Sequence, residues 1–246
     1  MQNSGFTLFL EIAIFGFSFF SLIVTFFIIR SVGRGSLSTP FISFAVGTLL
    51  VGLSRVFLFI ADRGVYHLED VTMHIWWHLI LYFGLFAFIF GGSRLKKVAT
   101  SVTGNFFNGF DFAVLSLLTS LAILVFFIAQ PLEVVMDPVF VGSFVDKFGL
   151  YHFIAMVLAA ISGIYIYQIK SSWGKLLSVS VYPLLAFLFL TSLQHLWEAA
   201  SENWKIISIT PDGGEEVERF IVLPALFFLA FGFWRIARFI SRKEEL

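Results

Sequence analysis

Histidine is the residue type in this sequence best suited to bind a metal ion. The chain has five histidines and no cysteine, so thiolate metal sites, disulfide bonds and cysteine nucleophiles are excluded. His74 and His78 stand four residues apart, and on a helix this spacing lets two imidazoles reach the same ion. Asp70 lies about one helical turn before His74, where its carboxylate can bind the ion or orient a histidine. The pattern predicts a metal site in this segment.

His152 and His195 are further candidate ligands, each on a different apolar segment. A line of small residues follows His152 at helical spacing: Ala155, Ala159 and Gly163. Small residues let two helices approach closely, so His152 is expected to face a neighbouring helix rather than lipid. The predicted metal ligands are His74, His78, His152, His195 and Asp70. Imidazole and carboxylate without thiolate suit zinc, copper(II) or non-haem iron.

Haem is an alternative cofactor for the same histidines. Two histidines on facing helices, such as His78 with His152 or His195, can bind haem iron from both sides. The 34 phenylalanines would suit a porphyrin, but they are spread over the whole chain. A bare ion is therefore favoured over haem.

Glu11, Arg55 and Glu198 are ionisable residues in or at the ends of apolar segments. Charged side chains are costly in hydrocarbon and usually face the interior of a helix bundle. Glu11 and Arg55 are expected at a similar depth, which predicts an ion pair, either structural or part of a proton or ion pathway. Glu198 lies on the same side of its helix as His195. It is expected to bind the metal ion through its carboxylate or to orient a histidine ligand.

The composition indicates the elements that must position these groups. Of 246 residues, 59% are hydrophobic and 13% are charged, about half the charged fraction of a soluble domain. This excludes a cytosolic enzyme, a nucleic-acid-binding protein and a disordered regulator. The expected fold is all-α, a single seven-helix transmembrane domain over residues 1–246. The predicted spans lie at about 6–29, 41–60, 75–92, 112–130, 149–169, 177–197 and 218–237.

The distribution of lysine and arginine predicts the orientation in the membrane. Eleven of the 16 basic residues fall at one set of helix ends and four at the other. Cytoplasmic loops carry the excess of basic residues, so we expect a multi-pass cell-membrane protein with its N-terminus outside and its C-terminus in the cytoplasm. The predicted ionisable groups then lie in the outer third of the bundle and form a site that opens towards the external side of the membrane.

An internal repeat is a further prediction. A shift of 141 residues superposes the first three spans on the last three, with Phe90-Gly91 on Phe231-Gly232 and Arg94 on Arg235. Both sets would start outside, which gives a parallel 3+1+3 arrangement of the kind that some transporters use. A small transporter or channel is therefore one alternative function.

The leading functional hypothesis is an outward-facing transition-metal site used for redox chemistry or sensing, in a free protein or as a subunit of a larger membrane complex. Whether the protein is an enzyme stays open. A seven-helix receptor is the other alternative, since the helix number and orientation match that architecture. Retinal is excluded as its ligand at the usual place on the last span, because the sequence has no lysine between Lys205 and Lys243.

Overall fold

A computed structural model describes residues 4–32, 38–62, 70–101, 149–169, 174–207, 209 and 211–243. The regular structure in these residues is helical, which confirms the all-α class. The long helices are α1 (Ser4–Val32), α2 (Ser38–Asp62), α3 (Asp70–Ser101), α6 (Leu150–Ile169), α7 (Gly174–Glu198) and α8 (Pro211–Lys243). A π-helical turn, η1 (Ala199–Asn203), continues α7.

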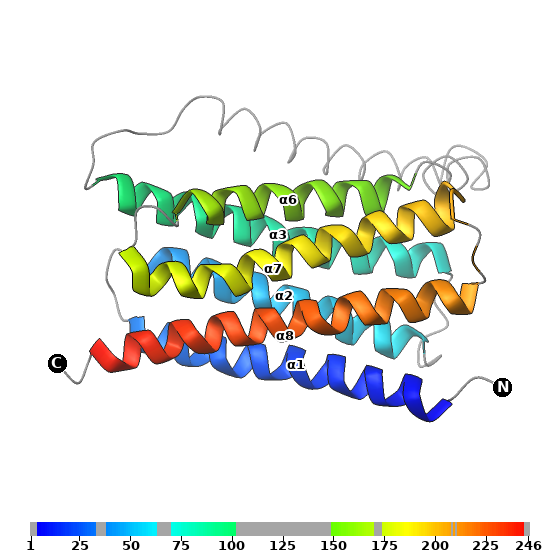
Figure 1. The fold of residues 1–246 in the computed structure, drawn as a ribbon, viewed down its shortest axis with the longest axis horizontal. Helices are drawn as coiled ribbons and strands as arrows, with labels where there is room; N and C mark the ends of the chain where they lie inside the picture. Colours follow the sequence, from blue (N-terminus) through cyan, green and yellow to red (C-terminus); the bar gives the residue numbers. More distant parts are fainter. Residues whose placement is uncertain are drawn as a thin grey trace.

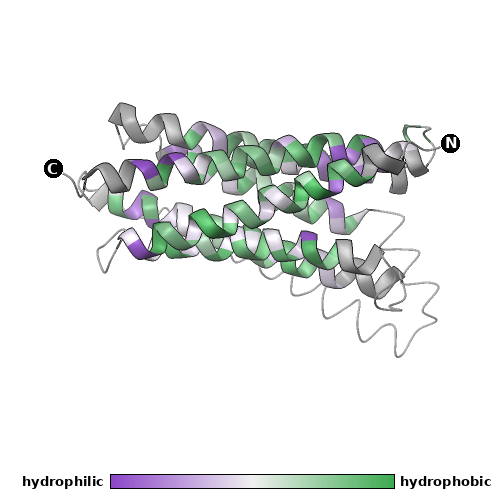
Figure 2. Ribbon diagram, turned by 90° about the horizontal axis from the view of Figure 1, so that it is seen from below, coloured by the Kyte–Doolittle hydropathy of each residue, from purple (hydrophilic) through white to green (hydrophobic). Residues whose placement is uncertain are grey.

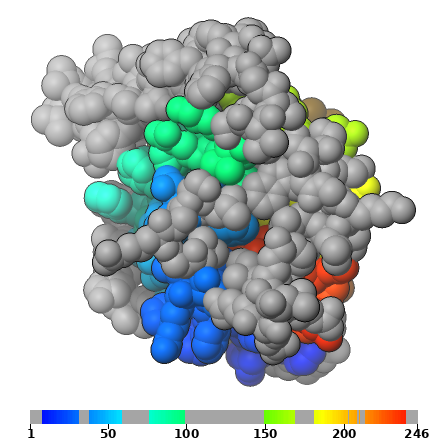
Figure 3. Space-filling view, turned by 90° about the vertical axis from the view of Figure 1, so that its left-hand side faces the viewer, coloured from blue at the N-terminus to red at the C-terminus, as the bar shows by residue number. Residues whose placement is uncertain are grey.

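The six long helices lie side by side and form a closed ring (Figure 1). Around the ring the order is α1, α2, α3, α6, α7, α8, and α8 packs against α1. The view along the bundle in Figure 3 shows the same order, with α3 in green beside α2 in blue and α8 in orange-red on the other side. The neighbours α3 and α6 run in the same direction, as do α8 and α1, whereas the other neighbouring pairs are antiparallel (Figure 1).

The described helices correspond to six of the seven predicted spans. The predicted span 112–130 lies outside the described residues. Five helices are long and apolar enough to cross a membrane, over Leu8–Ser31, Ser38–Leu58, Trp76–Val98, Leu150–Gln168 and Gly213–Arg238. Over its described side chains α7 does not meet this criterion, and it carries polar residues near its C-terminal end. A seven-helix bundle therefore remains a prediction.

Polarity is arranged as lipid requires, with apolar side chains outside and small polar ones inside. Phe26 and Phe189 are 64% and 67% exposed, whereas Ser21 and Thr48 are buried. Both hydroxyls donate to a backbone carbonyl one turn earlier in their own helix, which satisfies them where water is absent. Figure 2 shows apolar residues along the length of the bundle and polar ones towards its ends. These features support a lipid-embedded protein.

Phenylalanine side chains fill the middle of the helix bundle. Phe44, Phe88, Phe187 and Phe233 come from α2, α3, α7 and α8 and are almost completely buried. The ring centroid of Phe88 lies 5.8 Å from Phe44, 5.7 Å from Phe187 and 6.4 Å from Phe233. The middle of the bundle is therefore apolar, and the ionisable groups lie towards its two ends.

The two ends of the ring differ in charge. At the basic end, where α1, α3, α6 and α8 finish, the basic residues with described side chains are Arg30, Arg94, Lys96, Lys97, Arg235 and Arg238. The opposite end, called the site end below, is where α2 and α7 finish and where α1, α3, α6 and α8 begin (Figure 1). The predicted histidine and carboxylate groups lie at the site end.

Candidate metal centre

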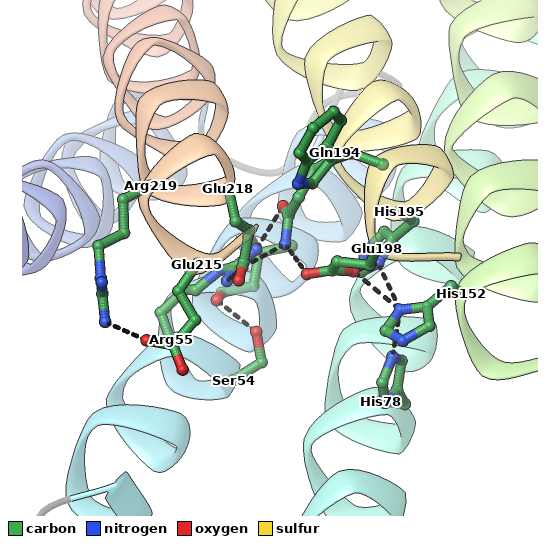
Figure 4. Close-up of polar contacts among 12 residues, drawn as sticks. Ser54, Arg55, His78, His152, Gln194, His195, Glu198, Glu215, Glu218 and Arg219 are labelled. Carbon is green, nitrogen blue, oxygen red and sulfur yellow. Dashed lines mark hydrogen bonds and ion pairs between the residues drawn. The ribbon is translucent and has the colours of Figure 1, made fainter. Parts of the chain in front are cut away.

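Three histidines from three consecutive helices of the ring meet at the site end (Figure 4). His78 comes from α3, His152 from α6 and His195 from α7, and all three are buried. Nδ1 of His152 lies 3.4 Å from Nε2 of His78 and 3.4 Å from Nδ1 of His195. One ligand nitrogen from each ring lies within 4.8 Å of the other two. A single ion could therefore be reached by all three.

Glu198 adds a carboxylate to the three imidazoles. Its Oε2 lies 2.6 Å from Nδ1 of His195 and 2.8 Å from Nδ1 of His152. Because an ionised carboxylate only accepts hydrogen bonds, both rings can donate their Nδ1–H to it when no metal is bound. The same oxygen also faces the nitrogens that would bind an ion, so it can share that ion with them.

The separations suit a tetrahedral metal ion. Zinc binds imidazole nitrogen at about 2.0–2.1 Å, which puts neighbouring ligands of a tetrahedron about 3.3–3.4 Å apart. The two measured nitrogen–nitrogen distances, from His78 to His152 and from His152 to His195, are both 3.4 Å. The third nitrogen pair, His78 with His195, lies within 4.8 Å. Oε2 of Glu198, at 2.6 Å and 2.8 Å from the two Nδ1 atoms, is too close for a ligand of the same ion and would have to move outward by about 0.5–0.8 Å.

A buried hydrogen-bond network extends from Glu198 to α2 and α8. Nε2 of Gln194 donates to Oε1 of Glu198 at 2.8 Å and to Oε1 of Glu218 at 2.9 Å. Arg55 donates to Oε1 of Gln194 at 2.5 Å, and its other terminal nitrogen lies 3.3 Å from Oε1 of Glu218. The network therefore joins residues of α2, α7 and α8 to the histidines (Figure 4).

The charges in this network favour a bound cation. Arg55 contributes one positive charge, and Glu198 and Glu218 contribute two negative charges, so these three described residues together carry one net negative charge. An unbalanced charge is costly in a buried site. The excess of negative charge fits a site that accommodates a positive ion.

Aromatic rings enclose His78 and limit its movement. The Trp77 ring centroid lies 4.2 Å from that of His78, and Tyr151 stacks on His78 at 5.4 Å with an interplanar angle of 28°. The Tyr82 hydroxyl donates to the backbone carbonyl of Tyr151 at 2.7 Å. These contacts exclude water from one side of the centre and hold His78 towards His152.

The structure brings His78, His152, His195 and Glu198 together, and all four are candidate residues from the sequence. Asp70 and His74 belong to α3 by their backbone, but their side chains lie outside the described residues. Their role as ligands therefore stays a prediction.

Glu11 and Arg55, the predicted ion pair, have other partners in the part of the chain that the structure describes. Arg55 reaches across the ring to Glu218 and Gln194, and Glu11 lies 3.7 Å from Arg219 on the adjacent helix α8. Since α1 packs against both α2 and α8, the difference comes from the direction of the side chains. Arg55 points into the interior of the bundle towards Gln194 and Glu218, and Glu11 lies beside Arg219 of α8. Both residues are at the site end, but in different pairs.

Sequence reasoning missed Gln194, Glu218 and Trp77 as members of this region. Gln194 is four residues before Glu198, which places the two on one helix face, and this spacing was the available signal. Glu218 reads in the sequence as one of many acids at helix ends. Trp77 reads as an interfacial aromatic residue, and only the packing of α2 against α3 places it between Arg55 and His78.

Comparison with known proteins gives no relative from which a function can be taken: no family model, no curated protein and no solved structure matches the chain.

Proposed function

We propose that the protein is an integral membrane protein that binds one transition-metal ion between α3, α6 and α7. The ligands are Nε2 of His78, Nδ1 of His152, Nδ1 of His195 and Oε2 of Glu198. The observation that carries this proposal is the meeting of three buried imidazoles and a buried carboxylate, with nitrogen–nitrogen distances of 3.4 Å. Such a cluster is rare by chance in an apolar bundle, because each polar group costs free energy there.

Zinc is the metal that this ligand set favours. Three imidazoles and one carboxylate in a tetrahedral arrangement suit zinc, and the same ligand types also bind copper(II) and iron. Haem fits less well, because the imidazole nitrogens of His78 and His152 meet directly at 3.4 Å, and a porphyrin would have to separate them. Four protein ligands form a closed site, which favours metal sensing or a structural ion over redox chemistry.

The proposed orientation puts the metal centre near the outer surface. The excess of basic residues marks the basic end as cytoplasmic, so the site end, with the N-terminus, is outside. α3 finishes at the basic end and α6 begins at the site end (Figure 1). This relation is in keeping with the predicted span 112–130, which lies outside the described residues. A metal ion would then enter from the external side.

Metal analysis of the purified protein tests the proposal. The protein is extracted in detergent without chelator, and its metal content is measured by mass spectrometry together with a visible spectrum. We expect about one zinc ion per chain and no haem absorption. In His78→Ala and His195→Ala the zinc should be lost, whereas His67→Ala, outside the predicted span, serves as the matched histidine control. Wild-type protein that contains no metal and takes up none would contradict the proposal.

Transport is a second candidate function, favoured by the arrangement of the helices. α1, α2 and α3 follow one another around the ring in the same sense and with the same directions as α6, α7 and α8 (Figure 1). We propose that the two sets are parallel repeats related by a pseudo-twofold axis along the bundle. Parallel repeats of this kind are found in transporters, where the substrate lies between the halves.

Local contacts at equivalent positions support the repeat. The guanidinium carbon of Arg94 lies 4.9 Å from the ring centroid of Phe90, and that of Arg235 lies 5.7 Å from Phe231. The same shift of 141 residues relates both members of the two pairs.

The junctions between the two halves also correspond. The shift relates His152 to Glu11 and His78 to Arg219. His78 contacts His152 where α3 packs against α6. Arg219 lies 3.7 Å from Glu11 where α8 packs against α1. The proposed metal site thus occupies one of two equivalent junctions, and an ion pair occupies the other.

Zinc uptake into liposomes distinguishes transport from binding alone. Reconstituted wild-type protein should carry zinc to an enclosed fluorescent indicator, and His195→Ala should not. If the protein binds zinc but gives no flux above empty liposomes, the transport candidate is excluded and the binding site remains.

A further inference from the structure

We infer that Gln194 and Arg55 are positioning residues of the metal centre: neither binds the ion, but together they fix the directions of Glu198 and His78. This inference rests on the proposed metal site and adds residues from a helix, α2, that supplies no ligand. It follows from the contacts of the two side chains with Glu198, Glu218 and Trp77.

Gln194 uses every hydrogen-bonding group of its side chain. Its carbonyl oxygen accepts from Arg55, and its amide nitrogen donates to both Glu198 and Glu218. The side chain is 1% exposed. Because the arginine can only donate, the amide oxygen has to face Arg55 and the amide nitrogen has to face the glutamates. The orientation of the amide is therefore determined by its partners.

This orientation decides how Glu198 can bind a metal. Oε1 of Glu198 accepts from Gln194 at 2.8 Å, and Oε2 faces His152 and His195. With Oε1 held, the carboxylate can offer the ion only Oε2. Without the Gln194 amide, the carboxylate could turn and bind through both oxygens, which would change the geometry at the ion.

Arg55 acts on a second ligand through Trp77. Its guanidinium carbon lies 5.4 Å from the Trp77 ring centroid, within the range of a cation–π contact. The Trp77 ring lies 4.2 Å from the His78 ring, so the arginine supports the ring that packs on His78. Glu218 on α8 holds Arg55 in place at 3.3 Å. Residues of α2 and α8 thus help to hold the proposed ligands Glu198 of α7 and His78 of α3 in position.

Cobalt(II) is the probe that tests this inference. Four-coordinate cobalt absorbs visible light, and the band shape depends on the ligand set and its geometry, whereas zinc is silent. Cobalt is titrated into metal-stripped wild-type protein, Gln194→Met and Arg55→Lys. The matched control is Thr191→Val, because Thr191 is buried on the same helix and bonds only to the carbonyl of Phe187 in that helix. We expect cobalt affinity to fall about ten- to a hundred-fold in both variants, with an altered band shape, and to stay unchanged in the control.

The outcomes separate this inference from the proposed site. If wild-type protein gives no cobalt spectrum, the metal site is wrong and the positioning role falls with it. If wild-type binds cobalt and the variants match it in affinity and band shape, the positioning role alone is wrong, even when their metal-free melting temperatures are lower. If Gln194→Met does not fold, Arg55→Lys, which keeps the charge and loses the planar guanidinium, decides the question by the same two measurements.

Discussion

Glu198 on α7 and His152 on α6 meet through Oε2 and Nδ1, 2.8 Å apart, and both side chains are buried. The contact joins two neighbouring helices at the site end, and His195 approaches the same oxygen at 2.6 Å. A carboxylate buried between two imidazoles is stable only when positive charge or hydrogen bonds compensate for its lost hydration. Metal binding should therefore depend strongly on this one carboxylate.

Replacing Glu198 by glutamine should weaken zinc binding at least about tenfold, because the amide keeps the shape of the side chain but removes the negative charge and places a donor near the ion. Competition with a chromophoric chelator measures the affinity. Glu216→Gln is the matched control, since Glu216 is exposed on α8. Equal zinc affinity in wild-type protein and Glu198→Gln would show that the carboxylate is not a ligand.

Zinc should raise the melting temperature of wild-type protein but not that of His195→Ala. A ligand that binds only the folded state at a thousand times its dissociation constant stabilises it by about 4 kcal/mol. Thermal unfolding in detergent, with added zinc or with a chelator, measures the difference. A zinc-dependent rise of the same size in His195→Ala would place the binding site elsewhere.

Glu11→Gln should lower the free energy of unfolding by no more than about 1 kcal/mol and leave zinc affinity unchanged. The reason is that Glu11 and Arg219 form a long pair at 3.7 Å, with both side chains 21% exposed. Denaturant unfolding and zinc titration of the same preparation measure both quantities. Loss of zinc binding in this variant would connect Glu11 to the metal centre and contradict its separate place at the α8–α1 junction.

Gly47→Ala should destabilise the bundle by about 1–3 kcal/mol, because α2 and α3 approach closely at this residue. A Cβ at Gly47 would lie 2.8 Å from the Phe88 ring and 2.9 Å from the carbonyl oxygen of Gly84. Gly16→Ala is the control, since a Cβ there meets no atom within 4 Å. Thermal unfolding of the two variants checks the packing, and equal stability would contradict the close approach of the two helices.

The proposed orientation predicts one-sided labelling of introduced cysteines, in a chain that has no cysteine of its own. Glu216→Cys at the site end should react with a membrane-impermeant maleimide added to intact cells. Lys97→Cys at the basic end should react with this reagent only after the cells are permeabilised. Both residues are exposed in the structure, so accessibility of the protein surface is matched. The reverse pattern would invert the proposed topology.

The six long helices of the described residues could be predicted approximately from the sequence, because the hydropathy of each segment is a local property. The predicted span 41–60 lies within α2 (Ser38–Asp62), and 177–197 lies within α7 (Gly174–Glu198). The helix ends are less local, and α3 begins and ends beyond the predicted 75–92, at Asp70 and Ser101.

The candidate site could be predicted only in part. Residue type identified His78, His152, His195 and Glu198, because buried ionisable residues are few in an apolar chain. The sequence could not indicate which of them share a centre, since that depends on the ring order of the helices. Arg55 contacts Glu218 and Gln194 of α8 and α7, although α1 with Glu11 also packs against α2, and helical periodicity alone contains no information on such contacts across the bundle.

X-ray absorption at the zinc edge of the purified, zinc-loaded protein tests the central claim most directly. The proposed centre predicts about three imidazole nitrogens and one carboxylate oxygen around the ion, at about 2.0–2.2 Å, and loss of this zinc signal in His152→Ala. A spectrum without imidazole ligands, or one that is identical in wild-type protein and His152→Ala, would contradict a metal ion held between α3, α6 and α7.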